Sequence, residues 1–399
     1  MSEAENGRSN VTHIEQLRRR RAGRRLRRLL VLAVAAGVAA LYFTGAYSQG
    51  VLLARELVEA ARVALTPAAG WPVKTGIPEI LQAETLDGGF VLLGAQDAGV
   101  WSAGGNQLNT IQHGYARPAI SAGNTRFCLY GRSGYELRVE GRTETLYKRT
   151  FDQPILLAEM STGGNVAVVT QSDRFAAELS VYNSAMKFIY GWNPTDTEGT
   201  PVAVAFARDN KRLAVACLVA RGGSLQSNLY ILDVRSDEIA ASATLAGGQV
   251  LGLYWLTADR LLAVGDSAAA VYDTSTGERT AIYSYGGERL GAVSVSGQNS
   301  ALLFSPDTSD APARLVALDP EMQLLAEADV PAPATGVVCT RTAAYVLRQS
   351  GVAAYSLAGE PLWEMSTDTK PLAVLDAKQL LVFTGGQAQL LEEPGQAGA

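Results

Sequence analysis

The feature of this sequence that most constrains its fold is a short phrase that returns along the chain. Each copy has an apolar segment, a turn, and a second segment that carries Tyr, Val or Leu before Asp or Gly. Clear copies begin at Asn228, Ala269, Ala313 and Val352. Self-similarity at a period of about 40 residues is typical of propellers, in which each repeat forms one blade. We therefore predict an all-β fold, a β-propeller of four-stranded antiparallel blades.

The number of blades follows from the third strand of each repeat, which can be located along the whole chain. The eight anchor residues are Val100, Leu137, Val181, Ile231, Val271, Val316, Ala353 and Leu390. Their spacing favours eight blades, with seven as the alternative. The most complete repeat starts at Pro201 and has short apolar segments separated by polar turns such as Arg208 to Lys211.

The last repeat looks incomplete, because it has three apolar segments and then a polar tail. A propeller made of one chain must keep its first and last blades together. The extended segment from Trp71 to Thr75 precedes the first full repeat. We predict that it supplies the missing outer strand and closes the ring by hydrogen bonding.

A second strong signal precedes the repeats. The segment from Leu29 to Tyr47 has no charged residue over 19 positions, and at about 1.5 Å per residue it is long enough to cross a bilayer core of about 30 Å. Nine Arg residues lie between Arg8 and Arg28, which predicts a cytoplasmic N-terminus and an extracellular propeller at the cell membrane. A cleaved secretory signal is the alternative, but the long basic region before the apolar core argues against it.

These features divide the chain into five parts. They are a basic cytoplasmic tail (1–28), a single-pass transmembrane helix (29–47), a stalk or linker helix (48–70), the propeller (71–394) and a C-terminal tail (395–399). Helical patterning in the stalk would let Arg55 pair with Glu59.

Charge is distributed very unevenly. Residues 1–50 carry 9 Arg and 3 Glu, a net charge of +6, and the remainder carries 25 basic and 36 acidic side chains, a net charge of −11. An acidic domain repels phosphate backbones, so nucleic acid is excluded as a partner of the propeller. The basic tail is explained as a topology determinant that contacts anionic lipid.

The residues that most often build reactive sites are scarce. The three cysteines, Cys128, Cys217 and Cys339, are widely spaced and flanked by apolar residues, which predicts core thiols and neither a disulfide framework nor a metal site. The only histidines are His13 in the tail and His113, which we place in a strand-end turn. We predict no catalytic, cofactor-binding or metal-ligating residue and no cofactor.

Acidic turns such as Asp273 to Glu278 and Asp307 to Asp310 lack the spacing of a calcium loop. An Asp at the start of a turn usually accepts hydrogen bonds from its own backbone, and we expect that role here. Paired catalytic carboxylates remain open, because a propeller axis brings distant residues together.

Aromatic residues near the predicted strands have two interpretations. Packing between blades is their default role. Alternatively, one group would form a rim surface that binds a protein or glycan. The members of that possible binding surface are Trp192, Tyr254, Trp255, Tyr283 and Tyr285.

Two resemblances follow from these motifs. The sequences VYDTSTGERTAIYSY, from Val271, and AYSLAGEPLWEM, from Ala354, resemble repeats of quinoprotein-like propellers at Gly277 and Trp363, although the WD dipeptide of WD-repeat proteins is absent. Quinoprotein dehydrogenases also use adjacent cysteines, which this chain lacks, so the activity does not follow from the resemblance. Over nearly its full length the chain resembles an uncharacterised family of bacterial membrane-anchored proteins, domain of unknown function 5711. That resemblance implies a bacterial cell-envelope protein and names no site.

The leading hypothesis is a non-enzymatic, membrane-anchored propeller that acts as a binding scaffold for an envelope protein or a glycan. The alternative is an enzyme whose site lies in the central channel, either a carboxylate-dependent glycan hydrolase or lyase or a quinone-cofactor oxidoreductase. Two carboxyl groups about 5 to 9.5 Å apart in an open channel would favour the hydrolase.

Overall fold

The computed structural model describes residues 61, 63, 65–297, 299–306, 308 and 311–393. The chain divides into two compact units, Met1–Glu59 and Ala60–Ala399. Both predicted tails, the predicted transmembrane helix and most of the predicted stalk lie outside the described residues. Helical residues in the described part are Ala61, Val63 and Leu65, and no helix among the described residues has the length and hydropathy needed to cross a bilayer.

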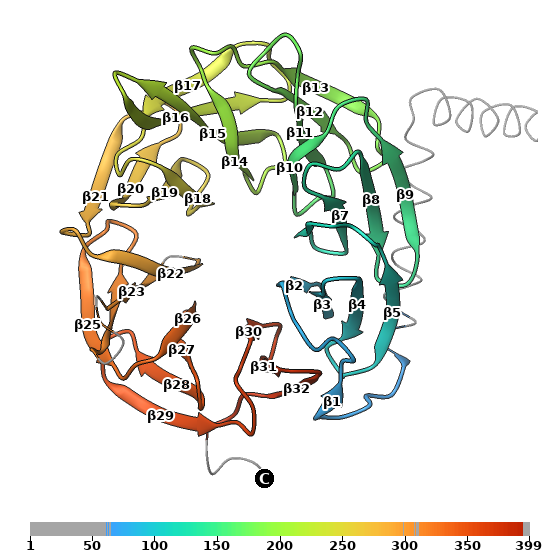
Figure 1. The fold of residues 1–399 in the computed structure, drawn as a ribbon, viewed down its shortest axis with the longest axis vertical. Helices are drawn as coiled ribbons and strands as arrows, with labels where there is room; N and C mark the ends of the chain where they lie inside the picture. The colour runs from blue at the N-terminus through green and yellow to red at the C-terminus, as the bar shows by residue number, and fades with distance from the viewer. Residues whose placement is uncertain are drawn as a thin grey trace, which may run out of the picture. The chain divides into compact units, whose positions relative to one another are not determined.

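The unit Ala60–Ala399 is a propeller of eight four-stranded antiparallel sheets arranged in a ring (Figure 1). Blade one contains β2 (Gln82–Leu86), β3 (Gly89–Leu93), β4 (Asp97–Ser102) and β5 (Gln107–Gln112), and blade two contains β6 (Pro118–Ala122), β7 (Arg126–Gly131), β8 (Glu136–Gly141) and β9 (Thr145–Thr150). Blade three contains β10 (Ile155–Met160), β11 (Val166–Thr170), β12 (Glu178–Tyr182) and β13 (Phe188–Trp192), and blade four contains β14 (Thr200–Phe206), β15 (Arg212–Arg221), β16 (Ser224–Asp233) and β17 (Ile239–Thr244). Blade five contains β18 (Val250–Trp255), β19 (Arg260–Gly265), β20 (Ala268–Asp273) and β21 (Arg279–Ser284), and blade six contains β22 (Arg289–Ser296), β23 (Asn299–Ser305), β24 (Ala313–Leu318) and β25 (Leu324–Val330). Blade seven contains β26 (Ala334–Cys339), β27 (Ala343–Arg348), β28 (Gly351–Ser356) and β29 (Pro361–Ser366), and blade eight contains β30 (Ala373–Asp376), β31 (Leu380–Thr384), β32 (Gln387–Leu390) and β1 (Val73–Lys74). The predicted blade number is therefore confirmed.

The ring closes through blade eight, whose outer strand comes from the start of the propeller. Strand β1 pairs antiparallel with β32, with Val73 opposite Ala388 and Lys74 opposite Gln387. The residue just before this strand, Trp71, packs on the aromatic ring of Phe90 in blade one, with a centroid separation of 6.3 Å. The prediction that Trp71 to Thr75 contains the closing strand is confirmed.

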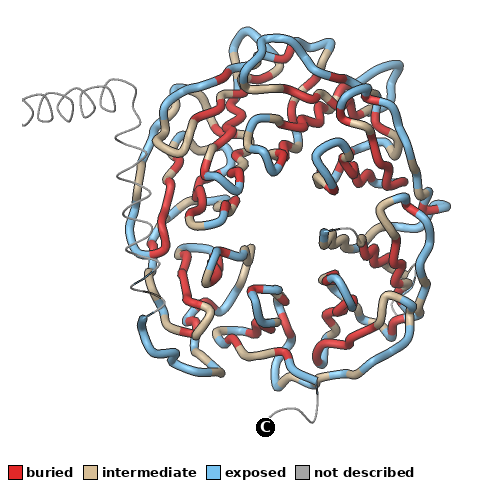
Figure 2. Tube along the Cα trace, turned by 180° about the vertical axis from the view of Figure 1, so that it is seen from behind, coloured by how far each residue is buried: buried red, intermediate tan, exposed pale blue. Residues whose placement is uncertain are grey.

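The core lies within and between the blades. All five residues of β3 are buried, whereas most of the outer strand β9 is accessible to solvent. Figure 2 shows the same division around the ring, with buried segments inside each blade and exposed turns. Neighbouring blades share their apolar faces, as where Val169 and Leu179 of blade three pack with Val215 of blade four. Burying each such side chain contributes about 1.5 to 3 kcal/mol.

The three thiols belong to this core. Cys128 in β7, Cys217 in β15 and Cys339 in β26 are buried and free. The prediction of core thiols is confirmed.

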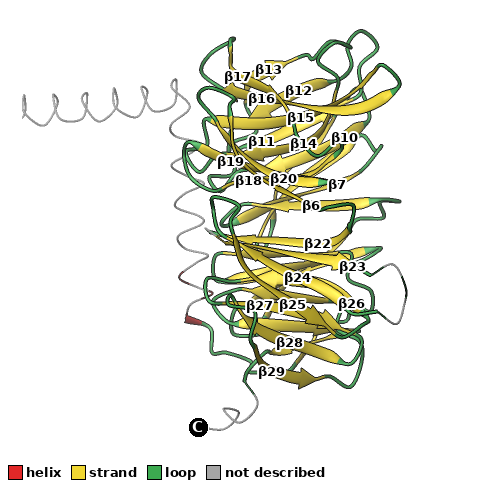
Figure 3. Ribbon diagram, turned by 90° about the vertical axis from the view of Figure 1, so that its left-hand side faces the viewer, coloured by secondary structure: helices red, strands yellow, loops and turns green. Residues whose placement is uncertain are grey.

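The propeller has two faces, seen edge on in Figure 3. The chain enters at one of them, because the amides of Ala69 and Gly70 donate to the carbonyl of Gly104, at 3.0 and 3.2 Å, in the turn between β4 and β5. We call this side the N-terminal face. In blades one to seven it carries the turns that join the first strand to the second and the third to the fourth, and in blade eight it carries the turn between β30 and β31. The opposite side is called the far face.

Candidate functional site

A depression lies on the N-terminal face at the mouth of the central channel. It is formed by the turns that follow the innermost strands of blades four to eight, and we call it the basic depression. Two cavities of about 700 and 630 Å³ make it up, and both are lined by Arg208, Ser296, Gly297 and Arg341. A volume of this size is typical of a site that holds a small ligand or a short chain segment.

One wall is the turn between β14 and β15. The carboxylate of Asp209 accepts hydrogen bonds from the backbone amides of Lys211, at 2.8 Å, and Arg212, at 3.1 Å. Asn210 adopts the left-handed region with φ at 58°, which Asn tolerates better than most residues. Burial acts to raise the pKa of Asp209, but the hydrogen bonds outweigh it and hold that pKa below its usual value. The sequence thus folds this turn onto its own carboxylate.

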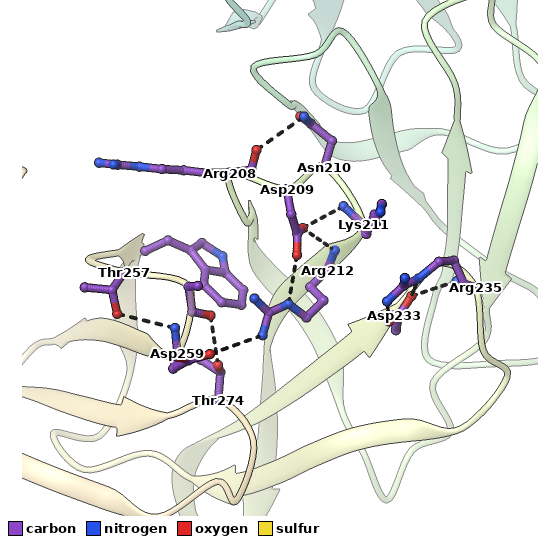
Figure 4. Close-up of polar contacts among 12 residues, drawn as sticks. Arg208, Asp209, Asn210, Lys211, Arg212, Asp233, Arg235, Thr257, Asp259 and Thr274 are labelled. Carbon is purple, nitrogen blue, oxygen red and sulfur yellow. Dashed lines mark hydrogen bonds and ion pairs between the residues drawn. The ribbon is translucent and has the colours of Figure 1, made fainter.

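Arg212 is fully engaged by its surroundings. Its Nε lies 3.1 Å from Oδ2 of Asp209 and its Nη1 lies 4.0 Å from Oδ1 of Asp259, and its guanidinium lies 5.3 Å from the ring centroid of Trp255. In Figure 4 the neighbouring Arg208 extends away from these partners. Arg212 is therefore a structural cation and Arg208 is not.

Three cations in the basic depression are exposed. Arg208 and Arg341 form no ion pair with any of the residues that the structure describes, and Lys378 approaches Asp87 only at 3.9 Å, with both side chains largely exposed. Such exposed pairs contribute little. Asp376, which lines the blade-eight side of the depression, carries one negative charge and does not balance the three positive charges. A local excess of positive charge thus sits in a domain whose overall charge is negative.

The channel itself holds a pair of carboxyl groups. Glu84 lies on β2, the innermost strand of blade one, and Glu159 lies on β10, the innermost strand of blade three. The charge of Glu84 raises the pKa of Glu159 although a whole blade separates their strands. The two carboxyls therefore interact electrostatically.

The intervening blade connects to this pair. The hydroxyl of Ser121, on β6, accepts a hydrogen bond from the amide of Met160 at 2.9 Å and bonds the carboxyl of Glu159. Burial raises the pKa of Glu84 to about 7 and, with the charge of Glu84, raises that of Glu159 to about 8. Tyr254, on blade five, has a raised pKa through burial and then through the charges of both carboxyls. These groups form one interacting set at the channel.

A second depression, of about 780 Å³, lies on the far face beside the closing segment and is lined by Ile77, Pro78 and Glu79 among others. His113 follows β5 close to it. The imidazole is half-buried, with Nε2 at 3.3 Å from the carbonyl of Gly94 and Nδ1 accepting from the amide of Tyr115 at 3.1 Å. Burial lowers the pKa of His113. The histidine thus lies in a strand-end turn, as predicted, and its ring hydrogen-bonds the backbone there.

The five aromatic residues predicted as a possible binding surface fall into three packing clusters. Trp192 packs between blades three and four, Trp255 packs between blades four and five, and the tyrosines pack between blades five and six. Tyr285 is only 1% exposed. Their packing matches the interblade role, and a contact with a partner stays a prediction.

The acidic turn after β20 follows the expectation drawn from sequence. Asp273 Oδ1 accepts from the amides of Ser275, at 2.8 Å, and Thr276, at 3.0 Å. Gly277 has a φ of 78°, and a Cβ there would lie 2.4 Å from the carbonyl oxygen of Ser242, so only glycine fits this turn. Among the described residues no group of three or more His, Cys, Asp or Glu could hold a metal ion.

Comparison with known proteins gives a family and a fold. Residues 79–391 match the family described as "Family of unknown function (DUF5711)". No curated protein matches the chain.

Solved propellers are similar in fold at low sequence identity. BamB from Moraxella catarrhalis is 13% identical, with a TM-score of 0.55, over 80% of this chain and 98% of that one. Sqt1 from Chaetomium thermophilum, bound to the N-terminus of the ribosomal protein L10, is 11% identical, with a TM-score of 0.58, over 80% and 98%. The C-terminal WD40 domain of Sif2 is 12% identical, with a TM-score of 0.57, over 82% and 99%.

Proposed function

The chain belongs to the family of unknown function DUF5711, and we propose that it is a membrane-anchored, non-enzymatic scaffold that holds a protein partner in the basic depression. The observation that carries this proposal is the convergence of turns from five successive blades on one concave site. Turns on a rigid framework are where binding residues are usually found. The Sqt1 complex offers an analogy, since a propeller of similar fold there binds the N-terminus of another protein.

The membrane anchor rests on the sequence from Leu29 to Tyr47 and on the Arg residues before it. An uncleaved anchor keeps the full-length chain in the membrane fraction after alkaline carbonate washing. Release of a shortened chain into the medium would instead show a cleaved secretory signal.

The binding role can be tested by photocrosslinking in cells. We expect a photoreactive amino acid at Ala258 or Thr342, both exposed in the basic depression, to give one discrete adduct. The same group at Ala116, exposed on the far face, is the positional control.

The adduct should disappear when Arg208→Glu and Arg341→Glu are introduced together, because both reverse the charge of the site. Arg279→Glu, on the outer edge of the N-terminal face, is the matched control and should leave the adduct unchanged. Adducts that are equal at all positions, or that survive the double substitution, would refute this site.

A second function, the channel enzyme, is favoured by one observation. Glu84 and Glu159 lie on innermost strands of blades one and three, the charge of Glu84 acts on Glu159, and both have raised pKa values that suit a proton donor at neutral pH. Incubation of the protein with purified envelope glycans tests it. Product that is formed by the unaltered chain and lost in Glu84→Gln and Glu159→Gln would favour the enzyme over the scaffold.

A further inference from the structure

The chemistry of the basic depression indicates what kind of partner it takes. Arg208 lies on blade four and Arg341 on blade seven, and the two side chains line both of its cavities. Arginine is well suited to bind carboxylates, because its planar guanidinium donates two parallel hydrogen bonds.

Several other arginines of the propeller are paired with carboxylates. Arg260 lies 2.6 Å from Glu321, Arg348 lies 2.6 Å from Glu364, and Arg212 is held by two aspartates as described above. In each of these pairs a carboxylate from the chain itself neutralises the guanidinium. Arg208 and Arg341 lack such a carboxylate among the described residues. Their guanidinium groups are therefore available to a carboxylate of a binding partner.

From this charge complementarity we propose that the basic depression binds an acidic segment of a partner protein, with carboxylates on Arg208 and Arg341. The inference rests on the proposed function and specifies its ligand. The depression is concave and part of its wall is apolar, including Leu256 and Leu380, so a chain segment can contact both its walls and its cations.

An anionic membrane surface fits the site less well. The outer turns of the N-terminal face carry exposed acidic side chains, which a flat bilayer would meet before it reached the channel mouth. They include Asp237, Glu238, Glu278 and Glu360. Repulsion there opposes docking on anionic lipid, whereas a narrow segment passes between these turns.

The test uses the full-length protein in a neutral detergent and a fluorescently labelled oligoglutamate peptide. We expect saturable binding, followed by fluorescence anisotropy, that weakens as sodium chloride is added. Arg208→Gln and Arg341→Gln should each weaken binding about three- to ten-fold, which is the range for one partly exposed charged contact. The matched control Arg279→Gln should bind the peptide as the unaltered chain does.

Three controls separate the alternatives. Both arginines are exposed, so their variants should keep the thermal unfolding midpoint of the unaltered chain. An oligolysine peptide should not bind. Inorganic phosphate and vesicles of phosphatidylglycerol and phosphatidylcholine test the other anions.

Failure of the peptide to bind, or equal binding by the Arg208→Gln and Arg341→Gln variants, would overturn the inference. Vesicle binding that both substitutions abolish, without peptide binding, would overturn it in favour of a lipid. If the peptide fails while the photocrosslink at Thr342 still depends on the two arginines, the proposed function stands and only the acidic ligand falls. Loss of both results would overturn both.

Discussion

The carboxyl pair in the channel makes a quantitative prediction about stability. Replacing Glu84 by Gln keeps the shape of the protonated carboxyl and removes its titration. The pKa of Glu84 is about 7 in the folded chain, compared with an ordinary value of 4.5, which we take for the unfolded chain. The folded state therefore binds this proton more tightly than the unfolded state.

The difference between the folded and unfolded pKa values fixes the direction in which stability changes with pH. Below pH 4.5 the group is protonated in both states and costs nothing. As the pH rises, the unfolded state ionises first, so the free energy of unfolding falls until the pH passes about 7. A pKa raised from 4.5 to about 7 corresponds to about 3 kcal/mol at high pH. Because Glu84 is only partly buried, solvent screening reduces this to about 1 to 3 kcal/mol.

Glu84→Gln should therefore leave the free energy of unfolding almost unchanged at pH 4 and raise it by about 1 to 3 kcal/mol at pH 9. Urea denaturation of the full-length chain across this pH range, followed by tryptophan fluorescence, measures the difference. Glu278→Gln, at an exposed turn, is the matched control and should show no such trend. A Glu84→Gln variant that is equally stable or less stable at pH 9 would refute the burial of this carboxyl in the channel.

Three further predictions concern other parts of the molecule. Glu84→Gln should lower the pKa of Glu159, because it removes the charge that raises that pKa. Carbon-13 NMR titration of the Glu159 carboxyl measures the change, and an unchanged pKa would show that the two groups do not interact. Trp71→Ala should destabilise the ring closure by about 1 to 3 kcal/mol, because the contact with Phe90 is lost. Limited proteolysis should then cut the variant early near residue 73, whereas unchanged resistance to the protease would show that β1 alone closes the ring. Burial raises the pKa values of three thiols, those of Cys128, Cys217 and Cys339. These thiols should react with an aromatic disulfide reagent only after urea unfolding. Rapid reaction of the folded chain would contradict their place in the core.

Much of the architecture could be predicted because it is encoded locally. Short apolar segments that are bounded by turns and recur at a fixed period favour strands, so the recurring phrase around Val271 and Ala353 predicted the blades and favoured eight of them. The missing fourth segment at the end of the chain likewise predicted the pairing of β1 with β32. Local chemistry also predicted that Asp273 would bond its own turn.

The candidate site could not be found in this way. Arg208 looked like part of an ordinary polar turn, and Arg341 and Lys378 were not distinguished from other surface cations. The three cations share one feature of the sequence, since each follows the first strand of its repeat. That feature indicates a common site only when it is known which turns meet at the channel mouth. The carboxyls of Glu84 and Glu159 were likewise two among 36 acidic residues after position 50.

The grouping of the aromatic residues also could not be settled from sequence. Trp192, Trp255 and Tyr285 were grouped because they lie in consecutive repeats, but closure of the ring turns them into three different interblade clusters. Sequence alone determined the propeller class, the repeating strands and the closing segment and favoured eight blades over seven, since these depend on periodicity and turn chemistry. Only the tertiary structure decided which charges converge, because the ring brings together residues that are far apart along the chain.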